Sequence, residues 1–591
     1  MKVFNNVHQQ FAEYFPSENL RPYLYLLSKK MSEGHICIDP EEIEMSDLDN
    51  LYPLPKRFPK YEKLVSDGSK TEPFIIYNHR LYLHRYFRYE SIIADSIRQF
   101  IKNEEEQIES NEKLLKEHSS FIKELFSVQQ KPEADVRINW QLIAALSASL
   151  NQFTIITGGP GTGKTTTVAK ILAILYSINP ALKVALAAPT GKAAARMGES
   201  LKNATTNANI GMSDAVKKGF ETIVPSTIHR LLGYQPHSIY FKHDQNNPVN
   251  YDVVIIDESS MIDVALFAKL FLALGPETKV ILLGDKDQLA SVEAGSLFGD
   301  LCQAQEKLNL FPPERMEFIN SFIEDKSQQL PESHISKTGH PLAGHVIELQ
   351  VSHRFSDDEG IGKFSKAIIQ NKPQIISDFF KNLDEQVQVD STYSDKIFQN
   401  FIAGYKTFIE EKDILEALKK LNNLKVLCVI REGEQGLYAI NKKIEQYLIK
   451  QNLINITGDF YYNRPVMITS NNYELSLFNG DIGLVRVDEN GELKVWFEDK
   501  GNLLSFSPSY VSNAETVFAM TIHKSQGSEF DKVMVILPDM EDVPLLTREL
   551  LYTAVTRAKS KVIVQGEESA ILKAADSYVK RGSGIIQRFN Q

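Results

Sequence analysis

Residues 154–170, TIITGGPGTGKTTTVAK, constrain the fold of this 591-residue chain more than any other stretch. An apolar run breaks into glycines and a proline, and then restarts with a lysine and three threonines. The segment from Gly158 to Thr165 fits the pattern GxxxxGK[ST] between a predicted strand and a predicted helix, which is the context that a phosphate-binding loop needs. Glycines let successive N–H groups approach phosphate oxygens, and the helix N-terminus adds partial positive charge. The stretch therefore predicts a polyphosphate site.

Within this loop, Lys164 can reach the β and γ phosphates, and Thr165 offers a hydroxyl to Mg²⁺. A second pair, Gly191-Lys192, lacks the preceding glycine at the required spacing and is not expected to bind a nucleotide. The residues expected to hold ATP here are Gly158, Gly159, Pro160, Gly161, Thr162, Gly163, Lys164, Thr165 and Thr166.

The segment VVIIDESSM (253–261) supplies a matching acidic pair. Its apolar residues predict a buried strand, and Asp257 stands at the carboxyl end, where ligands of parallel sheets bind. We expect Asp257 to hold Mg²⁺ and Glu258 to act as the base that polarises the attacking water.

Strands and helices alternate from about residue 138, which predicts a parallel sheet covered on both faces. A second block of the same kind begins near residue 425, and residues 470–514 inside it alternate apolar and polar residues between turns at Asn490-Gly491 and Lys500-Gly501. That alternation predicts a small antiparallel barrel inserted in the second block. The predicted strands are 153–157, 184–189, 253–257 and 279–285 in the first block, and 425–430, 464–469, 517–522, 532–537 and 561–566 in the second.

Composition limits the possible partners and locations. The net charge of −11 disfavours a global positive field, so any nucleic-acid site must be a local groove. No apolar run long enough for a membrane span occurs, and the N-terminus lacks a secretory leader, so a cytoplasmic location without membrane contact is expected. Cys37, Cys302 and Cys428 are too far apart to predict a disulfide framework or a zinc cluster.

Three polar residues far from the phosphate loop in the sequence predict further contacts with the bound nucleotide. Gln288 follows another apolar strand and is placed to sense the γ-phosphate or to align water. Arg354 lies on the boundary between the two blocks, and Arg557 lies late in the second block. Each arginine can stabilise charge on the γ-phosphoryl group, which indicates a nucleotide sandwiched between the blocks.

The motifs then resemble a known family. In order along the chain, they are similar to those of the superfamily-one DNA helicases, most closely the RecD family, the alpha subunits of exodeoxyribonuclease V (RecBCD). The resemblance implies two RecA-like motor domains with an SH3-like barrel in the second, and ATP-driven 5′→3′ translocation on single-stranded DNA. It also implies action at duplex ends with RecB-like and RecC-like subunits, in double-strand break repair and recombination. The segments that carry it are NWQ (139–141), GGPGTGKTT (158–166), APTGKAAARM (188–197), STIHRLLG (226–233), VIIDESSM (254–261), LLGDKDQLASVEAGSLFGD (282–300), SHRF (352–355), AMTIHKSQGSEFD (519–531) and LYTAVTRA (551–558).

The same resemblance implies further roles. Gln141 would read the adenine edge, and Glu529 matches a position that contacts the ribose. Other positions match the family's DNA contacts. Such side chains contact the phosphates and sugars of DNA, which positions a strand without reading its sequence and suits an acidic protein with a local groove. The positions that match DNA contacts are Thr190, Lys192, His229, Thr521, His523 and Lys524.

The domain organisation follows from these assignments. We expect an N-terminal domain over 1–130 that contacts the RecC-like subunit, a first motor domain over 131–365 and a second over 366–591. The boundary is expected at Lys131-Pro132-Glu133. The charged stretch 101–126 before it reads as an exposed helix, and RLYLHRYFRYE (80–90) resembles the RecD N-terminal domain more weakly.

Other readings make different predictions. A stand-alone RecD-like helicase would carry a longer N-terminal extension with DNA-binding hairpins, and a scaffold that had lost its motor would have broken catalytic motifs. A nuclease would need its own cluster of metal-binding carboxylates, which is not found outside the ATP site, so nuclease activity is expected in another subunit. A conjugative relaxase helicase would need a longer chain.

Overall fold

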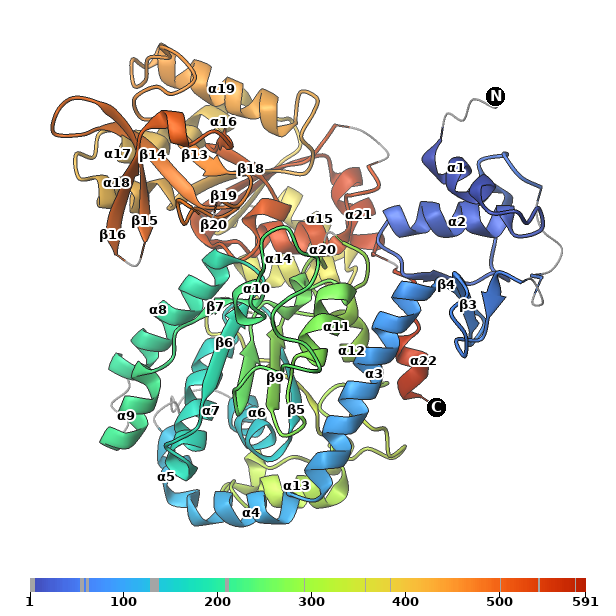
Figure 1. Ribbon diagram of the computed structural model, residues 1–591. Helices are drawn as coiled ribbons and strands as arrows, with labels where there is room; N and C mark the ends of the chain where they lie inside the picture. The colour runs from blue at the N-terminus through green and yellow to red at the C-terminus, as the bar shows by residue number, and fades with distance from the viewer. Residues whose placement is uncertain are drawn as a thin grey trace.

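Two parallel sheets form the centre of the protein, and two further sheets flank them (Figure 1). The computed structural model describes residues 6–53, 58–59, 63–127, 138–207, 212–291, 293–356, 358–382, 384–472, 474–499, 501–539, 543–579 and 581–590. The predicted boundary at 131–133 and residue 500 of a predicted turn lie outside the described residues. Among the helices that the structure describes, none is long and apolar enough to cross a membrane.

The first sheet has the strand order β10-β5-β9-β8-β6-β7, and every neighbouring pair is parallel. The four strands predicted here are confirmed, whereas β7 and β10 are too short to stand out in the sequence. The strands are β5 (Phe153–Thr157), β6 (Val184–Ala188), β7 (Ser226–Thr227), β8 (Val253–Ile256), β9 (Lys279–Gly284) and β10 (Val346–Glu348).

Helices cover both faces of this sheet because its strands are apolar on both sides. In β5, Ile156 packs into one core and its neighbour Ile155 into the other, as the period of two in a strand requires. One core is formed by α4 (Ile108–Glu117), α5 (Ser119–Ser127), α6 (Trp140–Leu150), α7 (Lys164–Ile178), α8 (Gly191–Asn207), α9 (Asp214–Glu221) and α13 (Pro313–Asn320). The other is formed by α3 (His84–Glu105), α10 (Ile228–Leu231), α11 (Val264–Leu272), α12 (Leu297–Cys302) and α22 (Ile585–Phe589).

The second sheet has the order β11-β20-β19-β12-β18 and is also parallel throughout. Its strands are β11 (Val387–Asp390), β12 (Leu424–Cys428), β18 (Ala519–Thr521), β19 (Phe530–Ile536) and β20 (Ala558–Gln565). One face packs on α14 (Gly360–Ile369), α15 (Pro373–Lys381), α20 (Arg548–Val555) and α21 (Glu568–Asp576). The other packs on α16 (Asp395–Ile402), α17 (Lys406–Ile409), α18 (Ile414–Leu421) and α19 (Leu437–Lys450).

One predicted strand of the second block belongs to a different sheet. The segment 464–469 was expected in the parallel sheet, but β13 (Pro465–Ile468) pairs antiparallel with two strands of the insertion. An apolar run of four residues reads the same in either setting, so the sequence did not separate them.

The insertion is a five-stranded antiparallel sheet with the order β16-β15-β14-β13-β17. Its hairpin at Asn490-Gly491 is confirmed, since Val487 pairs with Leu493 across it. The sheet reaches beyond the predicted limits of 470–514 at both ends. Besides β13, its strands are β14 (Ile482–Val487), β15 (Leu493–Asp499), β16 (Asn502–Phe506) and β17 (Ala514–Thr516).

The N-terminal region combines a small sheet with helices that reach onto the first parallel sheet. Strands β1 (Cys37–Ile38), β4 (Arg80–Leu83), β3 (Phe74–Tyr77) and β2 (Val65–Ser66) lie in that order, beside α1 (Val7–Tyr14) and α2 (Arg21–Ser32). The single exposed helix predicted over 101–126 is instead the end of α3 followed by α4 and α5. Their apolar sides are buried, and Phe100 stacks on Phe153 with 6.5 Å between ring centroids. The helices α3, α4 and α5 therefore share cores with the first parallel sheet, whereas α1 and α2 pack with the small sheet in a core of their own.

Candidate functional site

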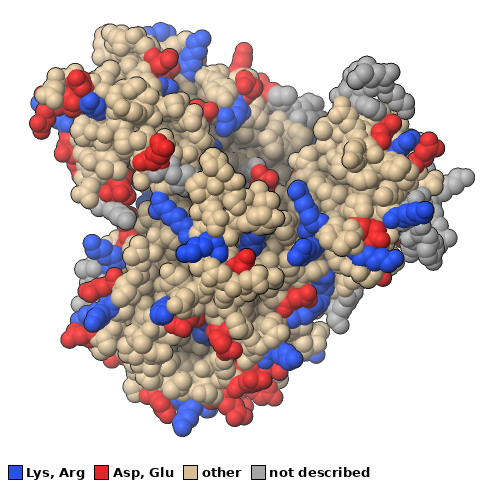
Figure 2. Space-filling model, viewed as in Figure 1, with Lys and Arg blue, Asp and Glu red and all other residues tan. Residues whose placement is uncertain are grey.

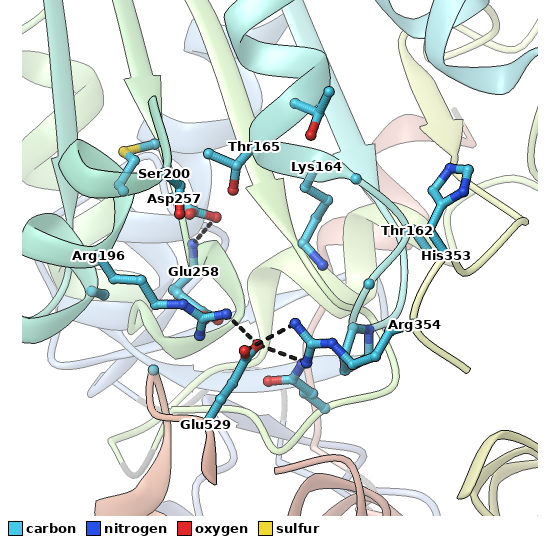
Figure 3. A pocket seen from close by; sticks show the side chains of 18 of the residues that line it. Thr162, Lys164, Thr165, Arg196, Ser200, Asp257, Glu258, His353, Arg354 and Glu529 are labelled. Atoms are coloured by element: carbon cyan, nitrogen blue, oxygen red, sulfur yellow. Dashed lines mark hydrogen bonds and ion pairs between the residues drawn. The ribbon is translucent and has the colours of Figure 1, made fainter. Parts of the chain in front are cut away.

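A cavity of about 420 Å³ lies between the two parallel sheets, at the carboxyl end of β5. Residues from the phosphate loop, α8, the end of β8 and the loop after β10 line it from one side, and residues 527, 529 and 557 line it from the second sheet. Figure 3 shows side chains from both sides converging on this space. The structure thus brings together the nucleotide residues that the sequence placed far apart.

The phosphate loop is built from backbone conformations that favour glycine. Gly161 and Gly163 have φ of 80° and 84°, the left-handed region that other residues rarely adopt. A Cβ on Gly163 would overlap Gln141 Nε2, and a Cβ on Gly161 would overlap Arg354 Cβ. Lys164 Nζ donates to the carbonyl oxygens of Gly158 at 2.5 Å and Gly159 at 3.2 Å. The loop therefore forms a close cradle with its lysine folded over it.

Gln141 lies beside this cradle, and only the nitrogen of its side-chain amide is hydrogen-bonded. Its Nε2 donates to Thr162 O at 3.1 Å, while its Oε1 is buried and has no hydrogen-bond partner. A buried acceptor without a partner is costly unless a ligand supplies a donor. The exocyclic amino group of adenine is such a donor, so the site fits an adenine nucleotide.

Asp257 and Glu258 follow β8 and face the phosphate loop (Figure 3). Glu258 has a left-handed backbone with φ of 52°, and its N–H donates to Asp257 Oδ1 at 2.8 Å. Burial, reinforced by the negative charge of Glu258, raises the pKa of Asp257 to about 6, and the charge of Lys164 opposes the rise. A carboxylate held in this way gains from a nearby cation, and the hydroxyl of Thr165 lies on the same side of the cavity.

Gln288 is buried at the end of the segment that follows β9. Its Nε2 donates to Asp285 Oδ2 at 2.9 Å, and Tyr552 OH of α20 donates to the same oxygen at 3.2 Å. Burial raises the pKa of Asp285, with Lys164 acting against the rise. The position predicted to sense the γ-phosphate is therefore tied to a helix of the second sheet.

The two predicted arginine fingers reach the cavity in different ways. Arg354, in the loop after β10, donates from Nη2 to Glu529 Oε2 at 2.9 Å, and its Nη1 lies 2.8 Å from Oε1. Arg557, just after α20, has only 3% of its surface exposed and donates to the carbonyl oxygens of Thr553 at 3.1 Å and Ser528 at 3.2 Å. Burial lowers the pKa of Arg557, and the carboxylates of Glu258 and Glu529 oppose the change.

Glu529, the predicted ribose contact, is the centre of a cluster of positive charges. It pairs with Arg354 and with Arg196 of α8 (Figure 3). Lys559 Nζ lies 3.7 Å from its Oε2. Burial alone would raise its pKa, but the guanidinium groups of Arg196 and Arg354 outweigh burial and lower the pKa to about 2. This carboxylate therefore connects the two sheets across the cavity.

Sequence reasoning missed several residues of the site, of which Arg196 is the most prominent. Ala193, Arg196, Met197 and Ser200 all line the cavity, and their spacing of three and four residues places them on one face of α8. That periodicity was visible in APTGKAAARM. His353 also lines the cavity, where its N–H donates to Gly161 O at 2.8 Å. It lies in the segment SHRF (352–355), from which only Arg354 was predicted to act at the site.

The predicted DNA contacts of the first sheet lie at its far edge, after β6 and β7. Thr190 Oγ1 accepts from the N–H of Ala193 at 3.2 Å at the start of α8, and His229 lies exposed on α10. Burial lowers the pKa of Lys192 to about 8, with Asp481 of the insertion opposing. Lys192 therefore lies near the second sheet's insertion, whereas His229 contacts Phe241 of its own region, with 5.6 Å between ring centroids.

The contacts predicted from the second sheet follow its edge strand β18. Thr521 is buried and its hydroxyl accepts from the N–H of Lys524 at 3.4 Å, whereas His523 and Lys524 are half-buried. Lys524 Nζ donates to Asn479 Oδ1 of the insertion at 2.6 Å. Its neighbour Phe478 lies under the guanidinium of Arg230, 4.5 Å from the ring centroid. Lys192 from the first sheet and Lys524 from the second therefore both interact with residues 479–481 of the insertion.

Positively charged side chains lie on the surface between the two lobes of the protein. Figure 2 shows a hollow between the lobe that carries α16–α19 and the lobe of the first sheet, with Lys and Arg side chains near its lower edge. This positive charge is local, since the chain as a whole has a net charge of −11.

Comparison with known proteins places the chain in a class and then in a family. A family model described as an AAA domain matches residues 141–294, and one described as a UvrD-like helicase C-terminal domain matches residues 516–565. Together with the phosphate loop and the arginines across the cavity, these matches define a superfamily-one helicase.

Relatives then specify the family. RecBCD enzyme subunit RecD of Haemophilus influenzae is 35% identical over 540 residues, covering 85% of this chain and 79% of that protein. Its counterpart in Buchnera aphidicola is 30% identical over 588 residues, covering 96% and 93%. The chain belongs to the RecD family. The ATP-dependent RecD2 DNA helicase of Deinococcus radiodurans is 28% identical over 444 residues, which cover 74% of this chain and 50% of that helicase.

Proposed function

We propose that the protein is an ATP-dependent DNA helicase that moves 5′→3′ along single-stranded DNA as the alpha subunit of a RecBCD-type helicase-nuclease in recombination and repair. The observation that carries the proposal is the cavity between the two sheets. Phosphate-binding residues line it on one side, and Glu529 and Arg557 line it on the other. A nucleotide bound there is contacted from both sheets at once.

The roles of the residues follow from their positions. Lys164 and the loop N–H groups would bind the phosphates, and Gln141 would bind adenine through its free acceptor. Thr165 and Asp257 would hold Mg²⁺, which neutralises charge on the phosphates when bound. Glu258 would orient and deprotonate water.

Closure of the cavity would bring Arg354 and Arg557 to the γ-phosphoryl group, where they would stabilise negative charge. Arg354 is now held by Glu529, and Arg557 by backbone carbonyls, so both guanidinium groups are ordered before any substrate charge reaches them. Ordered donors cost little reorganisation when charge develops on the γ-phosphoryl group. Glu529, released by Arg354, would then be available to the ribose.

The DNA strand would cross both sheets on the side of the insertion. Thr190, Lys192 and His229 would contact it from the first sheet, and Thr521, His523 and Lys524 from the second. Alternating grip by the two sets, driven by opening and closing of the cavity, would move the strand. The insertion would be an SH3-like barrel that acts as a wall for this path, and Phe478 stands at its tip beside Arg230.

Partners are proposed from the relatives. RecB-like and RecC-like subunits would complete a heterotrimer, with the N-terminal domain of 1–130 contacting the RecC-like subunit and the nuclease in another chain. The motor domains would span 131–365 and 366–591. A cytoplasmic location stays a prediction. The alternative, a stand-alone helicase, is favoured less because the relatives named as RecBCD subunits are 35% and 30% identical, whereas the RecD2 helicase is 28% identical.

The proposal is tested by DNA-stimulated ATP hydrolysis of the wild type and of Lys164→Gln. The variant should bind single-stranded DNA normally, keep the wild-type unfolding temperature and lose stimulated hydrolysis. Lys183→Gln, in the loop before β6, is a matched control that should change nothing. Full activity of Lys164→Gln would overturn the assignment of the site.

A further inference from the structure

The loop that follows Gln288 is held by parts of the chain that are far apart in sequence. This sensor loop comprises Leu289–Ser291 and Glu293–Gly295 among the described residues. From the second sheet, Thr553 Oγ1 accepts from Leu289 N at 2.9 Å, and Gln526 Nε2 donates to Leu289 O at 2.8 Å. The beginning of the loop is therefore fixed to α20 and to the segment 519–531. These two parts of the chain adjoin Arg557 and contain Glu529, which line the cavity from the second sheet.

The other end of the sensor loop is held by one side chain, Arg581. Its Nη2 donates to Ser291 O at 2.6 Å, and its Nη1 donates to Glu293 O at 3.0 Å and Gly295 O at 3.1 Å. The same Nη1 lies 3.5 Å from Ser291 Oγ. A planar guanidinium is the only side chain with enough fixed donors to satisfy three carbonyls in this way. Within the loop, the Ser291 hydroxyl also donates to Glu293 O at 2.9 Å and to Gly295 O at 3.0 Å. Arg581 is thus the side chain from outside the loop that ties these carbonyls to the rest of the protein.

Arg581 belongs to a segment that connects the two sheets. This C-terminal strap, residues 577–579 and 581–590, leaves α21 of the second sheet and ends in α22 against α3 of the first (Figure 1). Its end is firmly anchored, because Glu90 of α3 accepts from Gly584 N at 2.7 Å and from Arg588 Nε at 3.0 Å. The strap thus crosses from one sheet to the other with Arg581 on the sensor loop.

The N-terminal region completes the junction. Gly34 O accepts from Gly295 N at 2.9 Å, and Gly582 N donates to His35 Nδ1 at 2.9 Å. Arg581 also lies near the proposed DNA path, since burial and then its positive charge lower the pKa of His523. The sensor loop therefore lies where the second sheet, the strap and the N-terminal region meet.

We propose that Arg581 is a positioning residue for ATP hydrolysis, which holds the sensor loop so that Gln288 faces the γ-phosphate and which transmits movement of the second sheet to it through the strap. The proposal rests on the proposed function. Arg581 does not line the nucleotide cavity, and it acts through Gln288 rather than on the substrate.

The test measures DNA-stimulated ATPase of the full chain carrying Arg581→Ala. We expect kcat to fall about tenfold or more, because a small displacement of a catalytic group has effects of this size, while KM for ATP and the unfolding temperature stay near the wild type. Arg581→Lys, with fewer donors, should recover part of the loss. The matched control is Arg98→Ala, which removes a side chain that donates to Arg588 O at the far end of the same strap. It should keep the wild-type kcat.

A double-mutant cycle separates positioning from general damage. If Arg581 acts through Gln288, Arg581→Ala should have no further effect in a Gln288→Ala background. Additive losses, an unchanged kcat in Arg581→Ala, or an equal loss in Arg98→Ala would each overturn the proposal. If Arg581→Ala fails to fold, Arg581→Lys carries the test, and a wild-type kcat in that variant overturns it. Failure of the proposed function is distinguishable, because the wild type itself would then show no stimulated ATPase.

Discussion

Gly163→Ala is predicted to weaken nucleotide binding by straining the backbone of the phosphate loop and displacing Gln141. Gly163 has a left-handed φ of 84°, and a Cβ there would overlap Gln141 Nε2. A left-handed residue with a side chain costs about 1–2 kcal/mol. Displacing Gln141 also removes its 3.1 Å hydrogen bond to Thr162 O, worth about 1 kcal/mol.

The two costs together amount to about 2–3 kcal/mol for holding the binding-competent loop, which corresponds to a rise in Kd of about 30-fold or more. Equilibrium titration with a non-hydrolysable ATP analogue measures it. The matched control is Gly491→Ala, where φ is 81° and no atom lies within 4 Å of the added Cβ. That variant has the same backbone strain, far from the cavity, and should bind the analogue like the wild type. Wild-type affinity in Gly163→Ala would refute the reasoning.

Three further predictions concern charges. Glu529→Gln should destabilise the protein above pH 4.5, because lowering the carboxyl pKa from 4.5 to about 2 corresponds to about 3 kcal/mol. The stabilisation by a carboxylate with a depressed pKa is lost as pH falls through that range, so the difference in unfolding midpoint between wild type and variant should shrink from pH 4.5 toward pH 2. A difference that is independent of pH would count against the charge cluster. Lys524→Ala should weaken single-stranded DNA binding equally for all sequences and reduce the salt slope by about 0.7, whereas Lys420→Ala, on α18, should leave both unchanged. Arg557→Lys should lower kcat in single-turnover hydrolysis with little effect on ATP affinity, since a lysine cannot reproduce its two backbone hydrogen bonds; a loss of affinity alone would assign Arg557 to binding instead.

Local patterns were sufficient to predict much of the fold. The strands at 153–157 and 253–257 are apolar runs that end in functional residues, so both their type and their orientation were readable. The strand at 464–469 was assigned to the wrong sheet, because its residues are equally suited to either. The segment 101–126 was predicted to be an exposed helix because most of its residues are charged. The few apolar residues that form its buried side are Leu115, Ile122 and Phe126.

The site was predictable where residues belong to a motif and not where they depend on tertiary contacts. Lys164, Asp257 and Arg557 lie in local motifs, and the structure brings all three to one cavity. Arg581 lies in no motif, and its importance depends on carbonyl groups nearly 300 residues away in the chain. No local pattern encodes such a contact.

The central claim is that nucleotide hydrolysis between the sheets moves a DNA strand in one direction. A strand-displacement assay tests it most directly, using duplexes with a 5′ or a 3′ single-stranded overhang, with and without RecB-like and RecC-like subunits. The account predicts ATP-dependent unwinding from the 5′ overhang by this chain's motor, and its loss in Lys164→Gln. Unwinding from the 3′ overhang alone, abolished by the same substitution, would contradict the predicted direction.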